Sequence, residues 1–377
     1  MAGLEHAPDN DMKLIRAVSI WAILTSLSAP SFAAPLCRNL FVSTLNIELT
    51  EQKITELVGN AKSYQDKRNK DWSDRNKCLC CHTTLPYMLS RGLDAGSRVN
   101  FDKLKDLTVQ RVENQESRPW YHGDQAGRDS KPTESVLNAL TLLMHDLSSQ
   151  LPLQATTLKA VDSIFAKLET NGRLHWLDFN LQPFESKKGE LWGNSMALLA
   201  VEIAKKHSGY EPPVDKYAKL KAFVFSKKIQ LKTQERAVLL WANSQGAPGK
   251  FLSSELSSQF INGIIEAQNP NGSVYQKAAL GYGKREENVY ATAISLIGMI
   301  KAGYGNHPAA HKAAKWLADK QAIGNFLQMG DATVLWNAAS MNRTGSLLND
   351  RFASDYSTSY ASLALSMYQA EVFQIRP

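Results

Sequence analysis

The sequence contains few cysteines and no concentrated block of charge. Only four of its 377 residues are cysteine, and three of these lie between positions 78 and 81. A chain of this length can bury enough apolar surface to fold without disulfide bonds, so the clustering indicates chemistry rather than covalent stabilisation. The 43 lysines and arginines outnumber the 36 acidic residues, but the two signs are interleaved along the chain. This pattern argues against a nucleic-acid-binding arm and favours an ordinary solvated surface.

Long apolar runs are also missing, and the one short run near the N-terminus has the features of a signal peptide. Lys13 and Arg16 precede apolar residues 17–24, and Ser31-Phe32-Ala33 fits a cleavage site flanked by small residues. No stretch reaches the roughly 18 apolar residues that a membrane span requires. We predict a signal peptide over residues 1–33, with Met12 as the natural start. The mature protein is then periplasmic or secreted, without an integral membrane span; an uncleaved anchor is the alternative.

The cysteine cluster contains a C-x-x-C-H motif. Cys78, Cys81 and His82 have the spacing at which a c-type haem is covalently attached. The two cysteines bond the haem vinyl groups, and the adjacent histidine binds the iron. We therefore predict covalently bound haem c, with His82 as the proximal iron ligand. The candidates for the distal position are His122, a vacant or water-ligated position, His145 and His175.

Cys80 complicates this prediction, because it places a third thiol inside the motif. A disulfide between Cys37 and Cys80 would protect it. Structural disulfides, or a bound metal or unmodified thiols, are alternatives to haem attachment. Zinc is disfavoured, because three cysteines and a histidine within five residues cannot all surround one tetrahedral ion. No cysteine follows Cys81 that could complete such a site.

The sequence changes character from about residue 133. Small and apolar residues alternate at helical spacing in six stretches, which are residues 135–140, 195–200, 237–242, 290–295, 332–337 and 360–365. Their nearly all-round apolarity predicts burial on more than one face. Amphipathic helices are expected between them, over residues 158–170, 256–268 and 309–321. Alternating buried and amphipathic helices in six units predict an all-α fold, a closed ring of helix pairs over residues 132–377. Residues 34–131 are expected to form an N-terminal segment that carries the haem motif.

Two of the connections in this region share an order of residues. Ile264-Ile265 is followed by Gln268, Gly272 and Val274, and Trp316-Leu317 by Gln321, Gly324 and Phe326. This order resembles the QW-type repeat of squalene-hopene cyclases, whose α/α-toroid fold is shared by protein prenyltransferase β-subunits. The chain also resembles bacterial proteins that join Cys-x-x-Cys-His-Thr-x-Leu-Pro-Tyr, here Cys78 through Tyr87, to such a toroid. The resemblance implies the α/α toroid as fold class.

The activities of those families are not expected here. A terpene cyclase protonates an alkene with an Asp-x-Asp-Asp cluster, which this sequence lacks. A prenyltransferase needs Asp, Cys and His ligands for zinc within the toroid, and no cysteine follows Cys81 here. Asp178 and Glu185 are candidate catalytic residues, since two carboxylates at the mouth of a toroid could serve as acid and base. The alternative is that Asp178 caps a turn and Glu185 is solvated.

Three functions are therefore left open by the sequence. The first is an exported c-type haem-binding protein that transfers electrons or binds a ligand, with a redox partner or a small apolar molecule as its partner and with no nucleic acid. The second is a periplasmic α/α-toroid enzyme that acts on a carbohydrate or an isoprenoid and has structural cysteines. The third is a binding protein without chemistry. Of these three, only the second is an enzyme.

Overall fold

The computed structural model describes residues 48–76, 79–92, 100–115, 127–179, 182–246, 251–277, 285–325, 332–336 and 347–373. The predicted signal peptide, Cys37, Cys78 and His122 lie outside these ranges. All described residues belong to one compact unit. Within these ranges, no helix combines the length and the apolarity that crossing a membrane requires.

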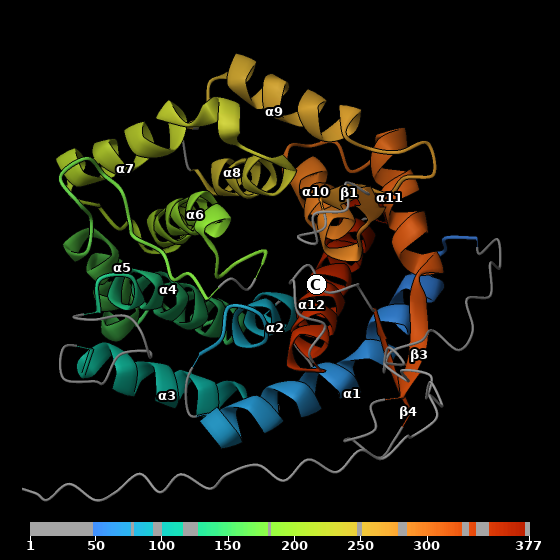
Figure 1. The fold of residues 1–377 in the computed structure, drawn as a ribbon, viewed down its shortest axis with the longest axis horizontal. Coiled ribbons are helices and arrows are strands. Elements are labelled where there is room, and N and C mark those ends of the chain that lie inside the picture. Colours follow the sequence, from blue (N-terminus) through green and yellow to red (C-terminus); the bar gives the residue numbers. More distant parts are fainter. Residues whose placement is uncertain are drawn as a thin grey trace, which may run out of the picture. The chain divides into compact units, whose positions relative to one another are not determined.

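Six helices of the described part of the chain form a closed inner ring (Figure 1). Each contacts the next, and α12 contacts α2 to close the circle. Nearly all residues of α10 are buried, as expected of a helix packed on several sides. The inner helices are α2 (Thr84–Arg91), α4 (Ser130–Ser148), α6 (Glu190–Ser208), α8 (Thr233–Gln245), α10 (Val289–Lys301) and α12 (Leu347–Val372).

A second layer of helices packs outside this ring (Figure 1). These helices bury only one face; α7, for example, buries Leu220 and Val224. The outer helices are α1 (Glu51–Asn76), α3 (Phe101–Glu113), α5 (Ala155–Ala166), α7 (Val214–Ser226), α9 (Ser254–Glu266) and α11 (Pro308–Asp319). The predicted α/α toroid is thus confirmed, and the described part of residues 34–131 contributes α1, α2 and α3 to it.

Five of the six small-residue stretches lie in inner helices, but the stretch over residues 332–337 does not. There the chain forms strand β4 (Ala332–Trp336), which pairs antiparallel with β3 (Gln321–Asn325) and places Gln321 opposite Trp336. A short apolar run with a β-branched centre fits a strand as well as a helix, and periodicity alone does not separate them. A second hairpin joins β1 (Tyr275–Lys277) and β2 (Arg285–Glu287).

The sixth inner helix is α2, which begins directly after the cysteine motif. All eight of its residues are buried. Pro86 lies in its first turn, where the missing backbone N–H would have no partner within the helix. The motif segment is therefore a part of the ring wall.

The two glutamines of the sequence repeat connect neighbouring outer helices. The Gln268 side-chain amide after α9 donates to the carbonyl of Ala309 in α11, at 2.9 Å. The Gln321 amide after α11 donates to the carbonyl of Leu57 in α1, at 2.5 Å. Because α1 is the next outer helix around the circle, the second bond helps to close the outer layer.

Polar residues on otherwise apolar inner helices bind the backbone of the preceding connection. The amide of Leu174 donates to Asn194 Oδ1 at 2.9 Å, and the amide of Val274 donates to Thr292 Oγ1 at 2.9 Å. Thr358 Oγ1 accepts from the amide of Trp336 at 3.1 Å. Buried backbone groups require such partners, which explains why these helices keep polar residues.

Gly59, in the middle of α1, offers a simple test of the outer layer. A Cβ atom added there would meet no other atom within 4 Å. Glycine within a helix costs about 0.5–1 kcal/mol relative to alanine, so Gly59→Ala is expected to raise the free energy of unfolding by about that amount. Urea denaturation measures it. A loss of stability in this variant would contradict the claim that position 59 is open and lies within a continuous helix.

Candidate functional site at the mouth of the ring

Residues capable of chemistry gather at the N-terminal ends of the inner helices. Cys80, Cys81 and His82 directly precede α2, and Glu185 precedes α6. Glu235 lies in the first turn of α8. Successive inner helices are joined through an outer helix that returns, so their N-terminal ends lie at the same side of the ring. We call this side the mouth.

Cys80, His82 and Glu185 form a compact cluster at the mouth. One sulfur, one ring nitrogen and one carboxylate oxygen of these residues all lie within 4.8 Å of one another. His82 Nδ1 is 3.7 Å from Glu185 Oε2. The His82 side chain is fully buried, and 11% of the Glu185 side chain is exposed. The backbone amide of His82 donates to Cys80 Sγ at 3.4 Å, which stabilises negative charge on that sulfur.

Cys81 differs from its neighbour Cys80. Burial raises the pKa of the Cys81 thiol well above its usual value, and the charge of Glu185 adds to this shift. Burial, aided by the charge of Glu185, therefore favours the neutral thiol of Cys81. The two adjacent cysteines are chemically distinct groups.

Aromatic side chains pack beneath the cluster. The His82 ring stacks on Phe352 at 5.0 Å between centroids and lies 5.2 Å from Phe184. Phe184 in turn contacts Trp192 at 4.4 Å and Tyr290 at 5.2 Å. We call Phe184, Trp192, Tyr290, Tyr356 and Tyr360 the aromatic floor; all five are fully buried.

A buried ionic network holds the motif segment in place. Asp355 of α12 accepts two hydrogen bonds from Arg68, at 2.8 and 2.7 Å, and one from Tyr64, at 2.7 Å. Thr83 Oγ1 donates to the same carboxylate at 2.7 Å. Arg68 and Asp355 are almost completely buried. The network therefore joins α1 and α12 to the residue that follows His82.

Glu235 lines a cavity at the mouth of about 290 Å³. Its carboxylate accepts hydrogen bonds from the backbone amide of Lys232 at 2.8 Å and from Gln234 Nε2 at 2.6 Å. Burial raises the pKa of Glu235, and these donors only partly oppose the shift. Four lysines also line the cavity: Lys187, Lys188, Lys227 and Lys232.

A neighbouring cavity of about 410 Å³ shares Lys232 with the first. Arg236, Tyr275 and Tyr290 contribute to its lining. The start of α8 thus lies between two hollows that are lined by cationic and aromatic side chains. Neither cavity includes a residue that the sequence had indicated as a site.

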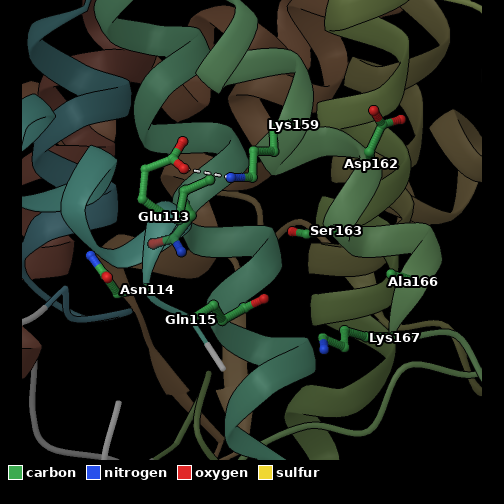
Figure 2. A pocket seen from close by; sticks show the side chains of 10 residues that line it. Glu113, Asn114, Gln115, Lys159, Asp162, Ser163, Ala166 and Lys167 are labelled. Atoms are coloured by element: carbon green, nitrogen blue, oxygen red, sulfur yellow. Dashed lines mark hydrogen bonds and ion pairs between the residues drawn. The ribbon is translucent and has the colours of Figure 1, made fainter. Parts of the chain in front are cut away.

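A larger cavity of about 570 Å³ lies between the end of α3 and helices α4 and α5 (Figure 2). Two of these helices, α3 and α5, belong to the outer layer. Glu113 and Lys159 form an ion pair across it, at 2.5 Å. Asp162 accepts a hydrogen bond from Tyr210 at 2.5 Å. The Glu113 and Lys159 side chains are largely exposed, whereas Glu235 at the mouth is buried, so this cavity lacks a buried carboxyl group of that kind.

The structure separates the two carboxylates that the sequence had indicated. The amide of Phe179 donates to the carbonyl of Glu185 at 3.0 Å, so the two backbone segments are adjacent. The Asp178 side chain is nevertheless exposed, whereas Glu185 faces His82. His145 Nε2 lies 3.1 Å from Asp102, and His175 Nε2 lies 2.6 Å from Glu169, so both of these histidines contact carboxylates.

Comparison with known proteins found related folds but no family. No protein-family model matches the chain, and no curated protein matches it. Among solved structures, a glycosidase is 11% identical, with a TM-score of 0.51, over 87% of this chain and 100% of that chain. A glycosidase in complex with glucose is 10% identical, with a TM-score of 0.50, over 86% and 100%. A variant of unsaturated glucuronyl hydrolase from Streptococcus agalactiae is 12% identical, with a TM-score of 0.53, over 86% and 93%.

These findings contradict the predicted haem c, which is wrong. The solved structures described above have the names of carbohydrate-acting enzymes rather than of haem proteins. Packing gives a physical reason, because Phe352, Phe184 and Tyr356 surround the His82 ring and leave none of it exposed. A porphyrin bound to this imidazole would have to displace these three rings. The likeness to squalene-hopene cyclases extends to the shared architecture alone, and what the comparisons establish for this chain is an α/α-toroid fold.

Proposed function

We propose that the protein is an α/α-toroid enzyme that acts on a carbohydrate, with Glu235 as its general acid. The observation that carries this proposal is a buried carboxyl group with a raised pKa that lines a cavity at the mouth. Burial favours the protonated form, which can donate a proton to the leaving oxygen of a glycosidic bond. Neighbours of the same fold that are named as glycosidases support this reaction class.

The lining of the cavities indicates a negatively charged substrate. Lys187, Lys188 and Lys227 surround the cavity that Glu235 lines, and Arg236 contributes to the adjoining one. A carboxylate or sulfate group on a sugar would be attracted to these cations. The aromatic ring of Tyr275, which is 41% exposed, offers an apolar face for a sugar. A neutral isoprenoid, such as a hydrocarbon or an alcohol, carries no charge to match these lysines and fits this lining poorly.

The substrate proposal is tested by incubating the purified protein with oligosaccharides of equal length that are neutral, uronate-containing or sulfated. Product release, followed by mass spectrometry, is expected from the acidic substrates and is expected to be faster than from the neutral ones. No release from any of them would overturn the enzyme proposal. Faster release from neutral substrates would overturn the substrate class.

Charge reversal at Lys188 tests the same idea from the side of the protein. Lys188→Glu is expected to lower kcat/KM for an acidic substrate by about tenfold, because it replaces an attraction by a repulsion at the cavity. The control is Lys219→Glu, an equal change of charge on the exposed surface of α7. Equal effects of the two variants would show that only net charge matters.

A further inference from the structure

We propose that Cys80, His82 and Glu185 bind one zinc ion through a sulfur, a nitrogen and an oxygen ligand. Their ligand atoms come from two segments about a hundred residues apart, before α2 and before α6, and lie within 4.8 Å of one another. The site uses neither Glu235 nor the cavity beside it. It therefore stands independently of the proposed enzymatic activity.

The distances fit a common ion. Zinc binds cysteine sulfur at about 2.3 Å, histidine nitrogen at about 2.0–2.1 Å and carboxylate oxygen at about 2.0–2.2 Å. Nitrogen and oxygen ligands on one tetrahedral zinc are then separated by roughly 3.4 Å. His82 Nδ1 and Glu185 Oε2 are already 3.7 Å apart. Small side-chain adjustments would bring all three ligands into place.

The chemistry of the donors also fits zinc. This ion accepts sulfur, nitrogen and oxygen ligands together, whereas calcium and magnesium prefer oxygen. A thiolate and a carboxylate supply two negative charges, which a divalent cation neutralises at a nearly buried position. The amide of His82, which donates to Cys80 Sγ, supports the thiolate that such a site requires.

The surrounding structure holds the ligands in position. The carbonyl of Cys80 accepts the backbone amides of Thr84 and Leu85, at 3.0 and 3.1 Å, which anchors this residue to the start of α2. Thr83 donates a hydrogen bond to Asp355, and the His82 ring packs on Phe352. Rigid surroundings reduce the cost of arranging ligands around an ion. Three protein ligands leave a fourth position for water or another small ligand.

Cys81 provides a matched control within the motif. It is adjacent to Cys80 and likewise buried, but it does not belong to the group of residues whose ligand atoms lie within 4.8 Å of one another. The proposal therefore assigns metal binding to Cys80 and not to its neighbour, and two variants that differ by one position in the chain distinguish the roles.

The test uses the full-length, reduced and metal-stripped protein, titrated with Co²⁺ as a spectroscopic probe of a zinc site. One ion is expected to bind per chain, with an absorption band from thiolate-to-cobalt charge transfer that Zn²⁺ abolishes on displacing the cobalt. Cys80→Ser is expected to lose this band. Glu185→Gln is expected to lower the affinity by more than the roughly 10- to 100-fold that loss of an outer-shell partner costs. Cys81→Ser, Asp178→Asn and Glu235→Gln are expected to bind like the wild type.

Several outcomes would overturn the proposal. These are the absence of stoichiometric binding by the wild type, a full thiolate band in Cys80→Ser, and loss of the band in Cys81→Ser with Cys80 intact. X-ray absorption of the zinc-loaded wild type needs no variant to fold and is expected to show one sulfur among the ligands; none or two would contradict the assignment. Loss of turnover in Glu235→Gln with normal metal content would separate this site from the proposed activity.

Discussion

Replacing Glu235 by glutamine is expected to lower turnover by roughly 100- to 10,000-fold, the range that one general acid contributes. Glutamine has nearly the shape of glutamate but carries no transferable proton. It can also keep the hydrogen bond to the amide of Lys232, because capping boxes accept either residue. A loss of turnover would therefore report on proton transfer rather than on a damaged start of α8. Steady-state kinetics on an acidic oligosaccharide measures it.

The same variant is expected to keep or gain stability, and this separates a catalytic role from a structural one. Burial raises the pKa of Glu235 in the folded state above its unfolded value. The stability that this group contributes is thus present below its unfolded pKa and is lost as the pH rises through its folded pKa. Glutamine does not ionise. In mildly alkaline buffer Glu235→Gln should therefore be at least as stable as the wild type, and a marked loss of stability would indicate a structural role.

Glu190 supplies a control in the same cavity. It lies in the first turn of α6, and both Nε and Nη2 of Arg173 donate to its Oε2, at 2.9 and 2.6 Å. Its carboxylate is already used in an ion pair, so we do not expect it to transfer protons. Glu190→Gln should leave the turnover close to that of the wild type. Equal losses in the two variants would remove the reason for choosing Glu235.

The largest expected loss of stability follows from changing Asp355 to asparagine. The buried Arg68 guanidinium would then face a neutral amide, and removing one partner of a buried ion pair costs about 3–5 kcal/mol. Tyr64 and Thr83 donate to the same carboxylate and would lose a charged acceptor. Urea denaturation of wild type and variant gives the difference in the free energy of unfolding.

The control for this measurement is Glu56→Gln. Glu56 pairs with Lys53 on the surface of α1, and 55% of its side chain is exposed. Surface pairs of this kind contribute about 0–1 kcal/mol, so the variant should unfold almost like the wild type. A similar small effect of Asp355→Asn would mean that the network does not hold α1 and α12 together.

The fold was predictable because burial and helix spacing leave a clear pattern in the sequence. Small and apolar residues such as Ala197, Leu198 and Leu199 reveal an inner helix without any knowledge of its neighbours. The prediction was wrong at residues 332–337, where a short apolar run pairs with Gln321–Asn325 instead of forming a helix. It also missed α2 as an inner helix. This helix has only eight residues, too few to show a clear helical period, and it contains Pro86.

The site was less predictable, because it depends on contacts between distant segments. Zinc had been disfavoured by counting ligands within five residues, a count that omits Glu185. Glu185 itself had been noted only as a carboxylate near the toroid mouth. Glu235 gave one local signal, a glutamate at the third position of a helix, and that signal indicates a capping box before it indicates catalysis. Only its burial and the adjoining cavity distinguish Glu235 from an ordinary capping glutamate.

The most direct test of the proposed activity is the pH dependence of product release from an acidic oligosaccharide by the wild type and by Glu235→Gln. We predict that release by the wild type falls as the pH rises through the raised pKa of Glu235, because the proton donor is then lost. We also predict that Glu235→Gln shows little release and no such decline. Equal release by both proteins, or no release by the wild type at any pH, would contradict the proposal.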